Sequence, residues 1–99
     1  MDIQFLSRQL QRCYEHESVA LRAWGPEVGR RYIQRLDLIL AADTFNSLLS
    51  MRYLRLHPLS GDRAGEWSIT LRGRWRLIVE PSGDGRLLLI REVSNHYGD

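Results

Sequence analysis

The spacing of apolar residues changes along the chain, from a period of about 3.6 residues in the first half to about 2 in the second. Alternating Ile3 and Phe5 predict a short strand at the start. Three helical segments are expected after it. Ser7 caps the first, which ends near the "EHE" cluster; the second begins near Ser18; and the glycine-proline pair at residues 25–26 separates it from the third.

The third helical segment carries the clearest apolar stripe, which comprises Val28, Tyr32, Leu36, Ile39 and Leu40. We expect this stripe to face the core. The other side of the segment mostly carries Arg30, Arg31, Gln34 and Arg35. A short helical turn over "FNSLLSM" follows, with Asp43 or Thr44 as its cap.

Alternating apolar and polar residues in the second half predict strands. The expected strands are "RYLRLH", "EWSITLR", "RWRLIVE" and "RLLLIREV". A two-residue turn at Arg72 and Gly73 and a longer turn at "PSGDG" join the last three. The last strand is apolar on both faces, so we expect it inside the sheet. Helices followed by an antiparallel sheet predict an α+β fold with the helices on one face of the sheet.

The composition is that of an ordinary globular protein, with 43% hydrophobic and 26% charged residues. Ninety-nine residues predict one domain that spans residues 1–99. No apolar run reaches the length of a bilayer span, and the start "MDIQFLSRQL" lacks the features of a secretory signal. We therefore expect a cytoplasmic protein, and the single cysteine, Cys13, agrees with a reducing compartment.

Positive charge is concentrated in one part of the chain, although the net charge is only +2. Every basic residue is an arginine. Residues 52–76 hold six arginines against only Asp62 and Glu66. Arginines beside Trp67, Trp75 and Tyr53 suit contacts with phosphates and bases. The two tryptophans, however, fall in register with aliphatic neighbours, which predicts that they belong to the core.

The candidate functional groups come from the predicted strands and the carboxyl-terminal tail. Tyr53, Arg55 and His57 share one face of a predicted strand, and Arg74 and Arg76 share a face of another. If these faces coincide, they form one basic surface that the tail can reach. The resulting set combines phosphate-binding and proton-transferring groups: His57, Arg63, Arg74, Arg76, His96 and Tyr97.

The residues indicate no metal or cofactor site. Cys13 and His16 have no partners at metal-ligand spacing. The "GDRAG" segment matches neither the phosphate-binding loop of nucleotide hydrolases nor the dinucleotide fingerprint. We therefore expect neither a metal nor a cofactor.

Two segments, "LRLHPLSGDRAGEWSITLRGRWRLIVEP" and "EVSNHYGD", resemble the RelE/ParE superfamily of bacterial toxins, in particular its HigB-like killer proteins. The resemblance extends over nearly the whole chain, and its most specific parts are the L-H-P-L-x-G-D-x-x-G-x-W run and the R-W-R-L pair. It implies a RelE-like microbial RNase fold, with two or three helices against a curved antiparallel sheet. It also implies a ribosome-dependent messenger-RNA endonuclease, held inactive by a co-expressed, HigA-like DNA-binding antitoxin.

The resemblance also implies roles for individual residues. His57 is expected at the edge of the active site, and Arg76 on the scissile phosphate. His96 and Tyr97 fall in the tail segment where relatives place catalytic or base-stacking side chains. The general base can be either His57 or His96. The other expected phosphate contacts are Arg55, Arg63, Arg72 and Arg74.

Two other functions fit the sequence. One is that of the ParE-like branch, which binds DNA gyrase and cuts no RNA. The other is a non-catalytic basic module that only binds RNA or an antitoxin, because alternating arginines would serve it equally well. On the nuclease interpretation, the loop "HPLSGDRAGEW" is functional and delivers His57 and Arg63 to the rim of the sheet.

Overall fold

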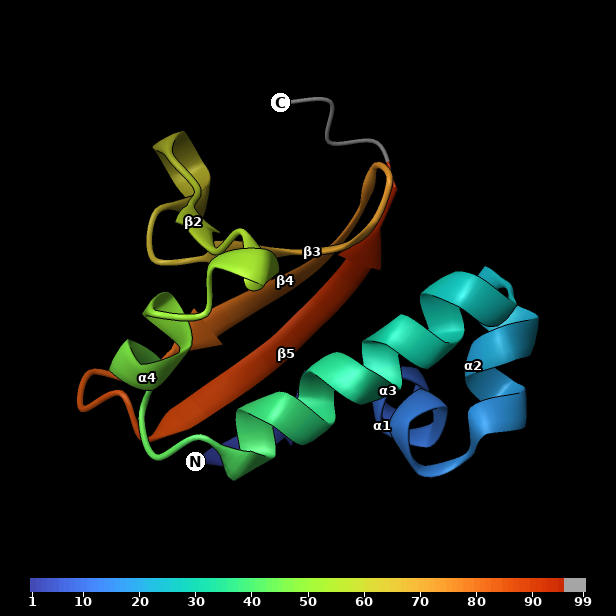
Figure 1. The fold of residues 1–99 in the computed structure, drawn as a ribbon. Helices are drawn as coiled ribbons and strands as arrows, with labels where there is room; N and C mark the ends of the chain where they lie inside the picture. Colours follow the sequence, from blue (N-terminus) through green and yellow to red (C-terminus); the bar gives the residue numbers. More distant parts are fainter. Residues whose placement is uncertain (96–99) are drawn as a thin grey trace.

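The computed structural model describes residues 1–95, in which helices cover one face of a five-stranded sheet (Figure 1). The helices are α1 (Arg8–Glu15), α2 (Glu17–Trp24), α3 (Pro26–Ala41) and α4 (Phe45–Leu49). The strands are β1 (Asp2–Phe5), β2 (His57–Pro58), β3 (Trp67–Arg72), β4 (Trp75–Pro81) and β5 (Leu87–Ser94). Two 3₁₀ turns, Arg52–Leu54 and Gly61–Arg63, lie on either side of β2. The expected α+β fold is confirmed.

The helix boundaries follow the expected local signals. Ser7 caps α1, since its Oγ accepts a hydrogen bond from the Leu10 amide at 3.2 Å. Gly25, with a φ of 84°, ends α2, and Pro26 begins α3. No helix within residues 1–95 is long and apolar enough to cross a membrane.

Helices α2 and α3 approach closely at Gly29. A Cβ atom on Gly29 would lie 2.8 Å from the Ala20 carbonyl carbon, which real structures essentially never show. Gly29→Ala should therefore lower the free energy of unfolding by about 1 kcal/mol, because overpacking costs about 1–3 kcal/mol and the better helix propensity returns at most about 1 kcal/mol. Urea unfolding followed by circular dichroism measures the change.

Gly83→Ala is the matched control for this prediction, because its added Cβ would meet no atom within 4 Å. Its stability should stay close to that of the unmodified chain. A Gly29→Ala variant that is as stable as the control would show that α2 and α3 can separate without cost.

The sheet is mixed, with strand order β1-β5-β4-β3-β2. The expectation of an antiparallel sheet is correct for β2 to β5 but wrong for β1, which pairs with β5 in parallel. Strand β5 lies between β1 and β4, as its two apolar faces predicted. Register shifts interrupt the ladders between Thr70 and Arg72 and between Ile78 and Val79, and such irregularities bend and twist strands.

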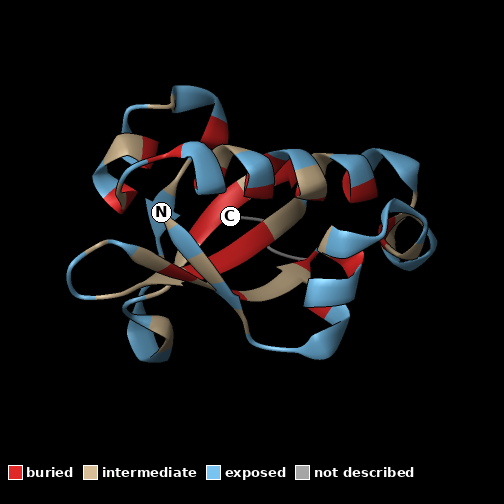
Figure 2. Cartoon of the chain, turned by 90° about the horizontal axis from the view of Figure 1, so that it is seen from below, coloured by how far each residue is buried: buried red, intermediate tan, exposed pale blue. Residues whose placement is uncertain are grey.

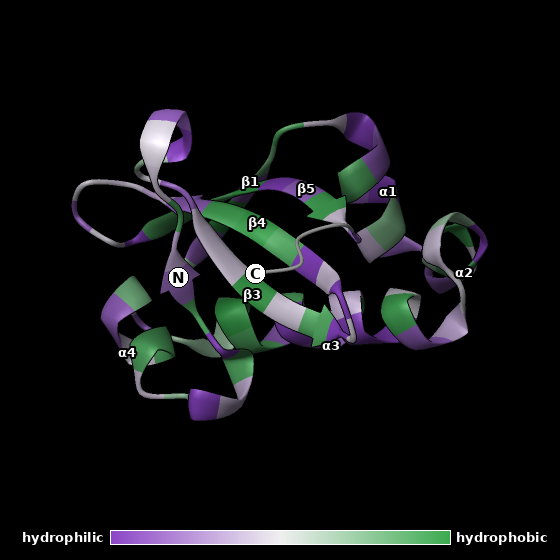
Figure 3. Ribbon diagram, turned by 90° about the horizontal axis from the view of Figure 1, so that it is seen from above, coloured by the Kyte–Doolittle hydropathy of each residue, from purple (hydrophilic) through white to green (hydrophobic). Residues whose placement is uncertain are grey.

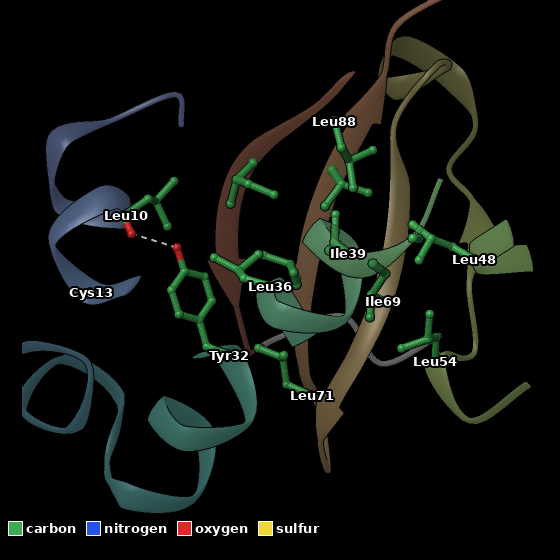
Figure 4. Packing of buried hydrophobic residues seen from close by; sticks show 14 of the residues in the cluster. Leu10, Cys13, Tyr32, Leu36, Ile39, Leu48, Leu54, Ile69, Leu71 and Leu88 are labelled. Atoms are coloured by element: carbon green, nitrogen blue, oxygen red, sulfur yellow. Dashed lines mark hydrogen bonds between the residues drawn. The ribbon is translucent and has the colours of Figure 1, made fainter. Parts of the chain in front are cut away.

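The core lies between α3 and the helix-facing side of the sheet. Tyr32, Leu36 and Ile39 of α3 pack against residues of β3 and β5 (Figure 4), and the Tyr32 hydroxyl donates to the Leu10 carbonyl at 2.7 Å. Figure 2 shows buried residues in red on the strands and on the helix sides turned toward them. Trp67 and Trp75 pack against this core but are only partly buried.

Two positions of α3 differ from the expected stripe. Leu40 is 40% exposed, whereas Arg35 is 5% exposed. Arg35 is stabilised in this position because its Nε donates to the Thr70 carbonyl at 3.3 Å and its guanidinium lies 5.3 Å from the Tyr53 ring centroid. Burial lowers its pKa, and the side chain fastens α3 to β3.

The expected strand over residues 52–57 is wrong. Arg52–Leu54 is a 3₁₀ turn, Arg55 has a φ of 49°, and β2 comprises only two residues. The left-handed Arg55 interrupts the extended chain, and Pro58 has no amide to continue a ladder. Consequently, Tyr53, Arg55 and His57 do not share a strand face.

The tight turn between β3 and β4 is also one residue later than expected. It consists of Gly73 and Arg74, with Arg72 paired to Trp75. Gly73 has a φ of 56°, a value that glycine adopts without a steric cost. Arg74 therefore lies in the turn instead of sharing a strand face with Arg76.

Candidate functional site

The face of the sheet that points away from the helices carries two of the predicted site residues, His57 and Arg76. We call it the open face and define it by two rows of paired residues. In one row His57 pairs with Ser68, Ser68 with Ile78, and Ile78 with Glu92; in the next, Thr70 pairs with Arg76 and Arg76 with Ser94. Paired residues of neighbouring strands point to the same face.

The open face brings His57 and Arg76 together. They lie in adjacent rows with only β3 between their strands. Two interstrand spacings separate β2 from β4 by about 10 Å. Ser68 and Ile78, which lie between them, are 3% and 0% exposed, so a substrate that contacts both side chains has to span this covered part of the face.

The His57 side chain is exposed at the edge of the sheet. Its Nδ1 lies 3.4 Å from the Arg55 carbonyl oxygen, a long contact. This contact favours the tautomer that carries its proton on Nδ1, and in that tautomer Nε2 is the proton acceptor. His57 is thus placed to exchange a proton with a bound ligand.

Arg76 is half-buried and folds toward the β3–β4 turn. Its Nη1 donates to the Gly73 carbonyl at 2.6 Å and to the Trp75 carbonyl at 3.0 Å. Within residues 1–95, its Nε and Nη2 make no hydrogen bond. The guanidinium is therefore positioned by the backbone and keeps donors for a phosphate.

Arg63 is engaged by carboxylates in an ion-pair ladder made of Glu80, Arg91, Glu66, Arg63 and Glu92. Arg63 lies 2.7 Å from Glu66 and 2.5 Å from Glu92, while Arg91 lies 3.4 Å from Glu66 and 2.9 Å from Glu80. Hydrogen bonds to Glu92 and Glu66 raise the pKa of Arg63. The ladder fastens the loop after β2 to β4 and β5, and a phosphate would have to compete with two carboxylates for Arg63.

Glu66 is the centre of this ladder, with a side chain that is only 13% exposed. Glu66→Gln should lower the free energy of unfolding by about 1–2 kcal/mol, because two guanidinium groups each lose a charged partner. Thermal unfolding measures the effect. Arg30→Gln is the control: its ion pair with Glu17 is more than half exposed on both sides, so we expect at most about 0.5 kcal/mol. Equal effects of the two variants would contradict a stabilising ladder.

The remaining predicted site residues lie in different places. Arg72 forms an exposed ion pair with Glu27 at 2.9 Å, and Arg74 is exposed in the adjacent turn. Arg55 is exposed beside β2. His96 and Tyr97 lie outside the described residues.

The sequence did not predict the carboxylates that bind Arg63. Glu66 and Glu92 are not among the predicted site residues; Glu92 belongs to a strand expected inside the sheet, and Glu66 lies in the loop before β3. The signal for a polar network was the charged pair Arg91-Glu92 within an otherwise apolar strand. Among residues 1–95, no group of three or more His, Cys, Asp or Glu side chains is arranged to hold a metal ion.

Comparison with known proteins gives both a sequence match and structural matches. No protein-family model matches the chain. Over 55 residues the chain is 42% identical to Endoribonuclease HigB of Proteus vulgaris, a match that covers 52% of this chain and 60% of that protein. The chain thus matches less than two thirds of the length of this curated relative.

Two solved structures share the fold over nearly their whole length. The YoeB/ParE toxin from Agrobacterium tumefaciens superposes with a TM-score of 0.60 at 22% identity, covering 98% of this chain and 100% of that chain. The same fold occurs in the YoeB-YefM complex from Staphylococcus aureus, with a TM-score of 0.63 at 18% identity and 98% of each chain covered. The chain is thus similar in sequence to an endoribonuclease HigB over about half of its length, and it shares the fold of these two solved structures.

Proposed function

We propose that this chain is the toxin of a toxin–antitoxin pair and acts as an endoribonuclease on messenger RNA. The observation that carries the proposal is the placement of His57 and Arg76 on one face of the sheet, with one strand between them. The 42% identity to an endoribonuclease over 55 residues supports it.

The proposed reaction is attack of a ribose 2′-hydroxyl on the adjacent phosphate. The O2′–P bond forms and the P–O5′ bond breaks, which leaves a 2′,3′-cyclic phosphate and a 5′-hydroxyl. Arg76 stabilises the extra negative charge on phosphorus, and comparable electrostatic donors contribute about 3 kcal/mol. His57 removes the 2′ proton or protonates the leaving 5′-oxygen, and His96 and Tyr97 are proposed for the remaining roles.

Few groups carry this chemistry, so we propose that the ribosome positions the message. Alignment of the 2′-hydroxyl with the departing oxygen is a large part of the barrier to such a reaction. Free RNA should then be cut poorly. A HigA-like, DNA-binding antitoxin is proposed as the inhibitory partner, and the existence of a complex of a YoeB chain with YefM supports a protein partner for this fold.

Mapping messenger-RNA ends in cells after induction of the chain without an antitoxin tests the proposal. We expect new ends within translated regions soon after induction. Arrested growth with intact messages and inhibited gyrase would instead indicate the ParE-like function. Intact messages with active gyrase would instead indicate the non-catalytic basic module that only binds RNA or an antitoxin.

A further inference from the structure

A cavity of about 480 Å³ lies at one end of the sheet, where the β3–β4 turn meets the junction of α2 and α3. Figures 1 and 3 both show the tip of this hairpin beside the amino-terminal end of α3. The residues that define its chemistry are Trp24, Glu27, Arg72, Arg74, Trp75 and Asn95. This volume is in the range of small-molecule binding sites.

Two tryptophans line this cavity and are only partly buried. The Trp24 ring packs edge-on against Tyr32, with 4.8 Å between the ring centroids. This contact restricts the movement of the Trp24 ring. The third tryptophan, Trp67, packs against Phe45 instead and does not line the cavity. Anchored indole rings at an opening are suited to stacking on a flat aromatic ligand.

The charged groups at this cavity favour an anionic ligand. The Arg72 guanidinium is paired with Glu27 at 2.9 Å. Arg74 is exposed, and within residues 1–95 it makes no hydrogen bond or ion pair. Asn95 adds an amide that can both donate and accept. Aromatic rings, an unpaired guanidinium and an amide together match a nucleotide.

The cavity adjoins the open face through the β3–β4 turn. Arg76 on the open face donates to the carbonyls of Gly73 and Trp75, two residues that line the cavity. An RNA strand with a phosphate at Arg76 can therefore extend around the turn toward the cavity. A base of that strand would be unstacked there, as in most sequence-specific recognition of RNA.

We propose that this cavity is a subsite for one unstacked nucleobase of the RNA substrate. Trp24 and Trp75 flank the base, Arg74 binds its phosphate, and Asn95 contacts the base edge. The inference rests on the proposed function, because it specifies how the RNA substrate of that site is held.

Titration of the purified chain with nucleoside 5′-monophosphates tests this subsite without any cleavage. Two of the three tryptophans line the cavity, so binding should quench tryptophan fluorescence to a saturable level. Trp75→Leu should weaken binding about tenfold, within the range measured for loss of one stacking contact. Arg74→Gln should weaken it several-fold and lessen its salt dependence.

Arg86→Gln is the matched control, because Arg86 lies in the turn between β4 and β5, at the opposite end of the sheet. It should bind like the unmodified chain. Arg74 is exposed in a turn, so Arg74→Gln should keep the fold. Its nucleotide affinity therefore tests the subsite even if Trp75→Leu unfolds the chain. Binding unchanged by Arg74→Gln, or equal binding of inorganic phosphate, would overturn the base subsite.

The two proposals can fail separately. Loss of cleavage in Arg76→Gln, combined with no quenching by any monophosphate, would remove the subsite and keep the nuclease. Monophosphate binding that depends on Arg74 and Trp75, in a chain that cuts no messenger RNA, would keep the nucleotide site and remove the nuclease.

Discussion

Replacing Arg76 by glutamine should slow single-turnover cleavage of ribosome-bound messenger RNA by about 10²–10³-fold. The Arg76 guanidinium is held by two backbone carbonyls of the β3–β4 turn, and its Nε and Nη2 make no bond within the described chain. Negative charge grows on the phosphate oxygens in the transition state. A fixed cation therefore stabilises the transition state more than the bound substrate, and its loss lowers the rate constant.

Arg76→Lys separates the contribution of charge from that of geometry. Lysine keeps the positive charge but lacks the planar fork, so its rate should fall between those of Arg76 and glutamine. Arg86→Gln, at the far end of the sheet, should cleave at the unmodified rate. Melting temperatures of all three variants show whether the fold is retained, and a folded Arg76→Gln with full activity would contradict the role of Arg76.

Replacing His57 by glutamine should slow the same reaction by about 10²–10⁴-fold, the usual contribution of one general acid or base. His57 is exposed on β2, and its Nδ1 contact with the Arg55 carbonyl favours Nε2 as the acceptor. The pH–rate profile should lose one of its limbs in the variant. If His57 had only a structural role, its replacement would instead lower the rate by the same factor at every pH.

A substrate with sulfur in place of the leaving 5′-oxygen identifies which proton His57 moves. Sulfur departs with little need of protonation, so this substrate should restore activity to His57→Gln if His57 is the acid. It should not do so if His57 is the base. His16→Gln, which replaces another exposed histidine, is the control and should retain full activity. Full activity of His57→Gln on the natural substrate would exclude both roles.

Local signals in the sequence were sufficient for the helices and for most of the strands. Ser7 and the Gly25-Pro26 pair act within a few residues, and the structure uses them as expected. The alternation around Ile69 and Leu77 likewise reports a strand with one buried face. Such features depend only on near neighbours in the chain, so they can be predicted from one sequence.

Other features depend on contacts between distant residues. The parallel pairing of Ile3 with Leu88 joins the two ends of the chain, and no local pattern encodes its direction. The expected strand is interrupted by the left-handed backbone of Arg55. The sequence did not reveal this, because Leu54 and Leu56 have the same spacing in a turn as in a strand. Arg63 forms a hydrogen bond with Glu92, which lies 29 residues further along the chain. The sequence around Arg63 therefore could not predict that this side chain belongs to the ion-pair ladder.

The central claim is that the open face carries the cleavage site, and the chemistry of the product ends tests it most directly. Ribosome-bound messenger RNA is treated with the purified chain or with the double variant His57→Gln/Arg76→Gln, and the ends are identified. The unmodified chain should leave 5′-hydroxyl and 2′,3′-cyclic phosphate ends, and the double variant should leave none above background. Products with 5′-phosphate ends, or equal cleavage by the double variant, would contradict the claim.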